Sequence, residues 1–191
     1  MAVPLLYAVI FHELAHGWVA YRLGDPTAKS LGRLSLNPLK HLDPIGTLML
    51  FLFGFGWARP VPVNLNLIRD RRRGMILVSS AGVVTNMLLA FCALFLYRLF
   101  PLTPSSIPAL LLYYFARINI ILAAFNLIPL PPLDGSKILM GFASPGVRKL
   151  LSQIERYGLI ILIGLLYLGV LNPVIVYFEW IILSFIKLLL P

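Results

Sequence analysis

Long apolar runs separated by short polar and basic links dominate the pattern of this chain. The runs over residues 75–97 and 109–128 are each long enough to cross a bilayer as a helix, for which about 20 residues suffice. The run over residues 2–21 is equally long, although three ionisable residues lie within it. The pattern therefore predicts three membrane-spanning helices in the first two thirds of the chain.

The other apolar segments are shorter or interrupted. Residues 45–57 contain three glycines, and at about 1.5 Å per residue they are too short for a helical span, so we expect a re-entrant or interfacial segment. Residues 137–157 are amphipathic and basic. Residues 158–190 are apolar but contain Asn172-Pro173, which predicts two short helices, with one kinked helix as the alternative. The expected fold class is an all-α polytopic membrane protein with about five transmembrane helices.

Composition supports a membrane protein over a soluble enzyme. Of the 191 residues, 60% are hydrophobic and only 12% are charged, whereas soluble domains average about half apolar and a quarter charged. The length suits a single integral-membrane domain over residues 1–191. The one cysteine, Cys92, excludes an intramolecular disulfide and a cysteine-based zinc site.

The net charge of +9 is distributed unevenly between the links. Nine Lys and Arg residues lie in the link over residues 22–74, one lies in 98–108 and four lie in 136–157. The positive-inside rule then places the first and third of these links in the cytoplasm and the N-terminus outside. Basic and aromatic residues do not alternate as on a nucleic-acid-binding surface, so we expect a multi-pass membrane protein and no nucleic-acid partner.

The segment "VIFHELAHGWVAY" carries the candidate chemistry. His12 and His16 are four residues apart, so on a helix both imidazoles project from one face and can reach one metal ion. Glu13 is rotated away from that face and can reach a water on the metal without binding the metal itself. This spacing is that of the His-Glu-x-x-His metalloprotease motif, and an ionisable residue inside an apolar span is a functional candidate by default.

A catalytic zinc site needs a third protein ligand and an open position for water. Asp134 is the acidic residue that directly follows an apolar run, in the proline-rich turn "PLPPLDG". Its carboxylate is therefore predicted at membrane depth, near the cytoplasmic side. His41, in "KHLDPIG", is the alternative third ligand.

At this point the chain resembles a known family. The segments "HELAHGWVAYRLGDPTAKSLGRLSLNPLKHLDPIGTLML", "ARPVPVN" and "FNLIPLPPLDG" are similar to those of the site-2 proteases, a family of intramembrane zinc metalloproteases. The similarity is greatest to the small prokaryotic branch without an inserted PDZ or CBS domain. One departure is Val83 in "AGVVTN", where family members carry proline, so the helix is expected to be straighter and the role of Asn86 is less defined.

The resemblance implies a set of roles. One zinc ion per chain is bound by His12, His16 and Asp134, Glu13 is the catalytic base, and Asn126 lies near the active site. The resemblance also implies that residues around 30–37 and 58–66 form a small membrane-associated β-sheet able to hold an extended substrate. The catalytic core then covers about residues 2–140, and C-terminal helices occupy 150–190.

The expected function is hydrolysis of peptide bonds within or near transmembrane segments of membrane-protein substrates. An unwound substrate stretch would pair with the edge-strand segment of Pro62, Val63 and Asn64. Asn126 could stabilise the oxyanion or orient substrate. The alternative is a metal-binding or metal-transport protein using the same residues. The sequence leaves the oligomeric state open.

Two further features invite hypotheses. Arg117 and Glu179 lie inside apolar runs and could form an ion pair between helices, whereas a snorkelling Arg117 is the alternative. The cluster "RDRRR" at Arg69–Arg73 is predicted to anchor the chain on the anionic lipid of the bilayer.

Overall fold

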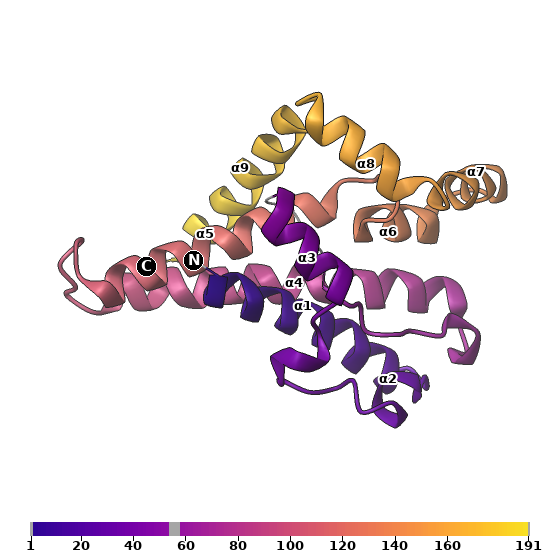
Figure 1. Cartoon of the computed structure of the whole chain (residues 1–191), viewed down its shortest axis with the longest axis horizontal. Helices are drawn as coiled ribbons and strands as arrows, with labels where there is room; N and C mark the ends of the chain where they lie inside the picture. The colour runs from indigo at the N-terminus through magenta and orange to yellow at the C-terminus, as the bar shows by residue number, and fades with distance from the viewer. Residues whose placement is uncertain (1, 54–57, 191) are drawn as a thin grey trace.

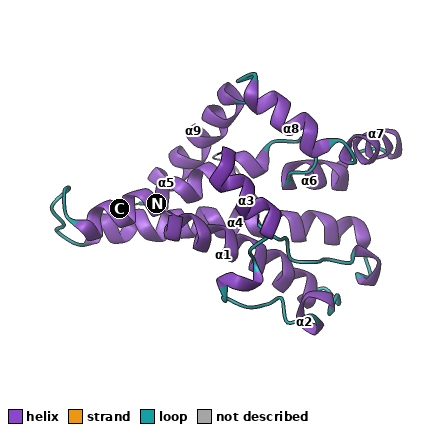
Figure 2. Cartoon of the chain, in the orientation of Figure 1, coloured by secondary structure: helices purple, strands orange, loops and turns teal. Residues whose placement is uncertain are grey.

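The computed structural model describes residues 2–53 and 58–190, and over these residues the chain consists of helices joined by loops (Figure 2). Four helices are long and apolar enough to cross a membrane: α1 (Ala2–Arg22), α4 (Arg71–Leu99), α5 (Ile107–Leu127) and α9 (Asn172–Leu189). The pair α7 (Pro145–Glu155) and α8 (Gly158–Tyr167) is bent by 77° and makes a fifth candidate if it is counted as one span. The predicted all-helical class with four or five spans is confirmed.

The helix boundaries follow from local chemistry. The Asp70 side chain accepts the Arg73 N–H and so caps the first turn of α4, and Ser106 caps α5 in the same way. Between α8 and α9 the backbone turns at Gly169, whose φ of +70° is accessible to glycine at little cost. Residues 158–190 therefore form two helices, as predicted.

Helix α4 is the centre of the molecule. It packs against α1, α5 and α6 (Asp134–Phe142), and α9 packs mainly against α5 with a smaller contact to α4 (Figure 1). Small residues allow the close approach of α4 and α5, and the core there contains Ala90, Ala123 and Ala124. Helix α4 is continuous past Val83, and the expectation that it is straighter there stays a prediction.

Several helix ends and both basic links gather at one end of this bundle. The C-terminal end of α1, the start of α4 and the end of α5 lie together on the right of Figure 1, beside α6 and α7. The loop between α4 and α5 lies at the opposite end. The two basic links therefore share one end of the molecule.

Short elements fill the link between α1 and α4. They are α2 (Thr27–Ser30), η1 (Pro38–Lys40), α3 (Pro44–Phe53) and η2 (Leu65–Leu67). Part of the predicted re-entrant segment is thus the ten-residue helix α3. The rest of that segment, residues 54–57, lies outside the described residues, so its re-entrant course stays a prediction.

The predicted β-sheet is wrong for the part of the chain that the structure describes. Residues 30–37 and 58–66 contain no strand, and the β-type pairing recorded there is an isolated antiparallel bridge between Leu42 and Ala58. The family resemblance implied strands here, but a strand also needs free backbone donors and acceptors on a neighbouring segment.

Those backbone groups are used by side chains instead. Prolines 60 and 62 have no N–H, while the N–H groups of Val61 and Asn64 donate to the carboxylates of Glu13 (2.8 Å) and Asp25 (2.6 Å). The Arg33 guanidinium donates to the carbonyls of residues 59 and 60 at 2.9 and 3.1 Å. The segment is therefore held as an extended loop against α1.

Candidate metal centre

The two histidines of the motif lie together on α1. Their Nε2 atoms are 3.0 Å apart, and both residues are buried, with exposed fractions of 6% for His12 and 8% for His16. The spacing of four residues places them one helical turn apart on the same face, as predicted.

Asp134 reaches the same point from a distant part of the sequence. Its Oδ2 lies 3.0 Å from Nε2 of His12 and 3.1 Å from Nε2 of His16. The residue begins α6 directly after the proline-rich turn, and Gly135 makes this position possible. A Cβ on Gly135 would lie 2.3 Å from the Leu127 carbonyl oxygen, so only glycine allows the turn to pack this closely on the end of α5.

The outer nitrogens of both imidazoles have acceptors that fix the ring orientation. Nδ1 of His16 lies 2.7 Å from the Val78 carbonyl oxygen, which can only accept, so this nitrogen carries the proton. Nδ1 of His12 lies 2.6 Å from Oδ1 of Asn86. In this tautomer both Nε2 atoms present lone pairs to each other and to Asp134, which is the arrangement that metal-binding histidines adopt.

This donor set fits a zinc ion. The ligand atoms of His12, His16 and Asp134 lie within 4.8 Å of one another, and all three residues are buried. Oδ2 of Asp134 is buried without a hydrogen-bond partner, although burying an unsatisfied carboxylate oxygen is costly. Two imidazoles and one carboxylate with converging lone pairs would be satisfied by a cation between them.

A chain of amides extends from the metal centre into the bundle. Nδ2 of Asn86 donates to Oδ1 of Asn119 (2.7 Å), and Nδ2 of Asn119 donates to the Phe115 carbonyl (2.8 Å). These bonds determine which end of the Asn86 amide faces His12. Sequence reasoning left the role of Asn86 open and missed Asn119. A polar amide inside an apolar run was the available signal.

Glu13 lies beside the metal ligands without joining them. Its Oε2 accepts the Val61 N–H at 2.8 Å, and its side chain lines a cavity of about 360 Å³ that also contains the three candidate ligands. The other residues of this cavity are Pro60, Val61, Val63, Leu65, Val78, Ser79, Asn126, Pro132 and Lys137. The second carboxylate oxygen of Glu13 has no recorded hydrogen bond within the described residues and is available for proton transfer.

The predicted substrate-contacting residues divide into two groups. Asn126 and Val63 line the cavity of the metal centre. Pro62 lines a different cavity, and the Asn64 side chain accepts the N–H of residue 66 at 3.1 Å as the cap of η2. Asn126 donates to the carbonyl of residue 122 in its own helix at 3.0 Å, which leaves its second N–H and its Oδ1 for other partners.

His41, the alternative third ligand, is not part of this cluster. It is fully buried, and its Nε2 lies 2.7 Å from the Ser35 carbonyl oxygen. His41 thus stabilises the loop between α2 and α3, and the alternative ligand assignment is wrong.

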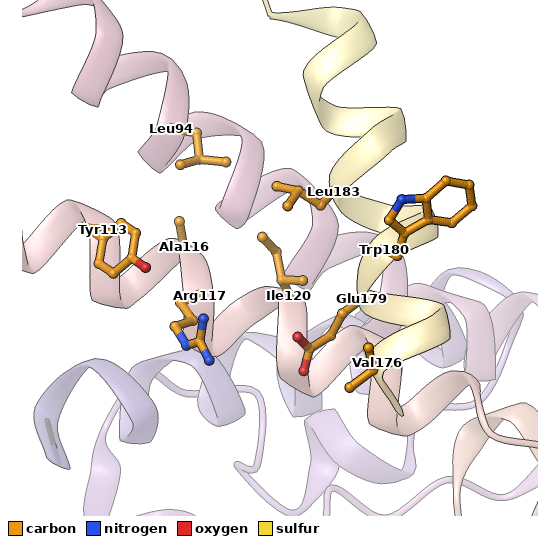
Figure 3. A pocket seen from close by; sticks show the side chains of 9 residues that line it. All are labelled: Leu94, Tyr113, Ala116, Arg117, Ile120, Val176, Glu179, Trp180 and Leu183. Atoms are coloured by element: carbon orange, nitrogen blue, oxygen red, sulfur yellow. The ribbon is translucent and has the colours of Figure 1, made fainter. Parts of the chain in front are cut away.

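Arg117 and Glu179 are close in space but do not form the ion pair that the sequence suggested. Both line a separate cavity of about 310 Å³ between α4, α5 and α9, where Figure 3 shows them among apolar and aromatic side chains. No ion pair between Arg117 and Glu179 is recorded among the described residues.

Comparison with known proteins gives concordant matches. A family model described as "Peptidase family M50" matches residues 103–170. The chain is 42% identical over 172 residues to "Putative zinc metalloprotease YwhC" of Bacillus subtilis, covering 86% of this chain and 78% of that protein. It is 28% identical over 171 residues to "Putative zinc metalloprotease Rip2" of Mycolicibacterium smegmatis, covering 87% of this chain and 66% of that protein.

A third relative is archaeal. "Zinc metalloprotease MJ0392" of Methanocaldococcus jannaschii is 26% identical over 142 residues, covering 74% of this chain and 34% of that protein. No solved structure matches the chain significantly.

Proposed function

Because this chain belongs to peptidase family M50, the site-2 proteases, we propose that it cleaves peptide bonds within or near transmembrane segments of membrane proteins. It is an intramembrane zinc metalloprotease. The observation that carries the proposal is the convergence of His12, His16 and Asp134 beside Glu13, on helices apolar enough to lie in a bilayer.

The proposed ligands of the single zinc ion are Nε2 of His12, Nε2 of His16 and Oδ2 of Asp134. A zinc ion with three protein ligands polarises a carbonyl and lowers the pKa of a water that it binds. The protein supplies a rigid, buried donor set, because hydrogen bonds from the two Nδ1 atoms to Asn86 and to the Val78 carbonyl fix the orientation of both imidazoles.

Glu13 is proposed as the general base and, later in the reaction, the general acid. One of its oxygens accepts the Val61 N–H, which fixes the carboxylate at the rim of the ligand set, and the other is free to accept a proton from water. The same carboxyl group can then give that proton to the amine that leaves. Asn126 lines the cavity and is proposed to donate its second N–H to the oxyanion.

The substrate is proposed to be an unwound stretch of a transmembrane helix. The cavity at the metal centre is bounded on one side by Pro60, Val61 and Val63 of the extended loop. The N–H group of Val63 is the donor left for pairing with substrate between the two prolines and Asn64, because those of Val61 and Asn64 are already donated to carboxylates. The proposed location is the plasma membrane, with the site toward the cytoplasmic side and the bilayer as its surroundings.

The test separates metal binding from proton transfer. Glu13→Gln keeps an oxygen that can accept the Val61 N–H but cannot act as a base. We expect about one zinc per chain in this variant, and cleavage of a reconstituted transmembrane substrate slowed by about 100-fold to 10,000-fold. Asp134→Ala, which removes a ligand, is expected to lose both the zinc and the activity.

Glu179→Gln is the matched control, since it makes the same chemical change in another candidate span and leaves the metal centre untouched. It is expected to keep the zinc and the activity. Cation transport that persists in Glu13→Gln vesicles, with no cleavage by the unmodified protein, would instead establish the metal-transport function.

A further inference from the structure

A second polar cavity lies at the basic end of the molecule. It has a volume of about 630 Å³ and is formed by the start of α4 together with α6 and α7. Five of its lining side chains are cationic and one is acidic: Arg71, Arg72, Lys137, Arg148, Lys149 and Glu155. The lining carries four more positive than negative charges, which favours an anionic ligand.

Three of these cations have no anionic partner among the described residues. No carboxylate in that part of the chain lies within ion-pair distance of Arg71, Lys137 or Lys149, although Glu155 lines the same cavity. Neighbouring like charges repel one another, and at the exposed Arg71 and Lys149 solvent screens this repulsion. An anion from outside the chain would therefore stabilise the cluster further.

The other two cations are held in place by backbone carbonyls. Arg72 donates from Nε to the Gly141 carbonyl and from Nη2 to the Phe142 carbonyl (3.1 Å), at the end of α6. Arg148 donates from Nη2 to the Ala143 carbonyl (3.1 Å), while its Nε is buried without a partner. The guanidinium groups are thus positioned in advance, and one buried donor lacks an acceptor.

The cavity lies at one end of the longest candidate span, because Arg71 is the first residue of α4. Basic residues at the end of a membrane helix are expected near lipid headgroups. Helix α7 is bent by 77° from the apolar helix α8, and it has exposed apolar side chains at Val147 and Leu150 beside Arg148 and Lys149. An amphipathic helix of this kind lies in the plane of the interface.

We propose that this basic cavity binds the phosphate headgroup of an anionic phospholipid. Guanidinium and ammonium groups are the side chains that bind phosphate oxygens, and Met75 and Met140 provide apolar lining for the glycerol region. The proposal does not depend on the protease function. The cavity does adjoin the metal centre, because Leu65 and Lys137 line both cavities.

The cluster "RDRRR" offers an internal control. Arg71 and Arg72 line the cavity, whereas Arg69 and Arg73, in the same short segment, do not. The double variant Arg71→Gln/Lys149→Gln removes two charges from the cavity, and Arg69→Gln/Arg73→Gln removes two charges from outside it. The two variants have the same net charge, so general attraction to anionic lipid is reduced equally in both.

Phosphatidylglycerol is added to the purified full chain in detergent, and native mass spectrometry measures how tightly the lipid binds. We expect the cavity variant to bind about tenfold more weakly and the control variant to stay within about twofold of the unmodified protein. A charge-preserving variant, Arg71→Lys/Lys149→Arg, is expected to bind the lipid within about threefold of the unmodified protein. Equal melting temperatures of the variants and the unmodified protein would exclude misfolding as the cause of weaker binding.

Three results would overturn the proposal. The first is an equal loss of binding in the cavity and control variants, which would indicate attraction to the surface as a whole. The second is equally tight binding of zwitterionic phosphatidylcholine. The third is binding of inorganic phosphate or of an acidic peptide at these residues with no binding of phosphatidylglycerol, which would assign the cavity to another anion.

Discussion

Gly82 is the residue of α4 that lies against both imidazoles of the metal centre. A Cβ at this position would lie 2.5 Å from Cε1 of His12 and 2.6 Å from Cε1 of His16. Contacts this short do not occur in folded proteins. Neither ring is free to move away, because Nδ1 of His12 is hydrogen-bonded to Asn86 and Nδ1 of His16 to the Val78 carbonyl. The absence of a side chain at residue 82 is therefore what allows His12 and His16 to occupy their observed positions.

We expect Gly82→Ala to lose zinc affinity by at least about tenfold, because displaced histidines no longer converge with Asp134. Helix propensity acts in the opposite direction, since alanine stabilises a helix interior by about 1 kcal/mol relative to glycine. Zinc content after dialysis against a graded chelator measures the effect.

Gly164→Ala in α8 serves as the control, because a Cβ there would have nothing within 4 Å. This variant is expected to keep its zinc and to melt at or above the temperature of the unmodified protein. Unchanged zinc affinity in Gly82→Ala would show that the rings can shift without losing the ligand geometry.

At the scale of elements, Asp25 joins the exit of α1 to the extended loop beside the metal centre. Its side chain accepts the N–H and the hydroxyl of Thr27 with one oxygen and the Asn64 N–H with the other. Burial by itself would raise the pKa of the Asp25 carboxyl, but the hydrogen bonds from Thr27 and Asn64 outweigh it and lower the pKa below its ordinary value.

This lowered pKa predicts a pH dependence of stability. The unfolded chain binds a proton at an ordinary pKa of about 3.9, above the folded-state value, so ionised Asp25 stabilises the fold fully above that pH. The contribution is lost as the pH falls through the folded-state pKa. We expect Asp25→Asn to lower the melting temperature in detergent at pH 7, and the difference from the unmodified protein to shrink below about pH 4.

The melting temperatures of Asp25→Asn and of the unmodified protein are compared at each pH. Titration of the zinc ligands affects both proteins equally and so cancels in the difference. Asp43→Asn provides a matched control, because Asp43 caps α3 through the Gly46 N–H, and within the described residues its side chain has no recorded hydrogen bond to the loop of residues 58–64. A difference for Asp25→Asn that stays constant down to pH 3 would contradict the role assigned to its charge.

At the scale of the whole molecule, charge and helix direction agree on one orientation. The end of α1, the start of α4 and the end of α5 share one end of the bundle, and the two basic links lie there (Figure 1). The single-Arg link between α4 and α5 lies at the other end. From this arrangement the positive-inside rule predicts that the metal centre faces the cytoplasm.

Cysteine labelling in intact cells tests this orientation. With Cys92→Ala as background, we expect Ser105→Cys, between α4 and α5, to react with a membrane-impermeant maleimide from outside. Gly146→Cys, where a side chain would meet nothing within 4 Å, is expected to react only after lysis. The reverse pattern would place the metal centre on the outer side.

The sequence by itself determined those features that depend on near neighbours in the chain. Apolar runs predicted the spans, since about 20 such residues cross a bilayer as a helix, and the four-residue spacing of His12 and His16 predicted one shared face. Asp134 was predictable because it is the acidic residue that follows an apolar run in a rigid turn.

Tertiary structure alone decided which polar groups meet. The family resemblance implied a strand within residues 58–66, but the N–H groups of Val61 and Asn64 are taken by Glu13 and Asp25, which are 48 and 39 residues away from them in the chain. His41, one of three histidines, is turned to the Ser35 carbonyl and away from the metal ligands, and Asn119 is joined to the metal centre through Asn86. Local periodicity describes the faces of a helix or strand, whereas a buried polar group takes its partner from whatever element packs against it.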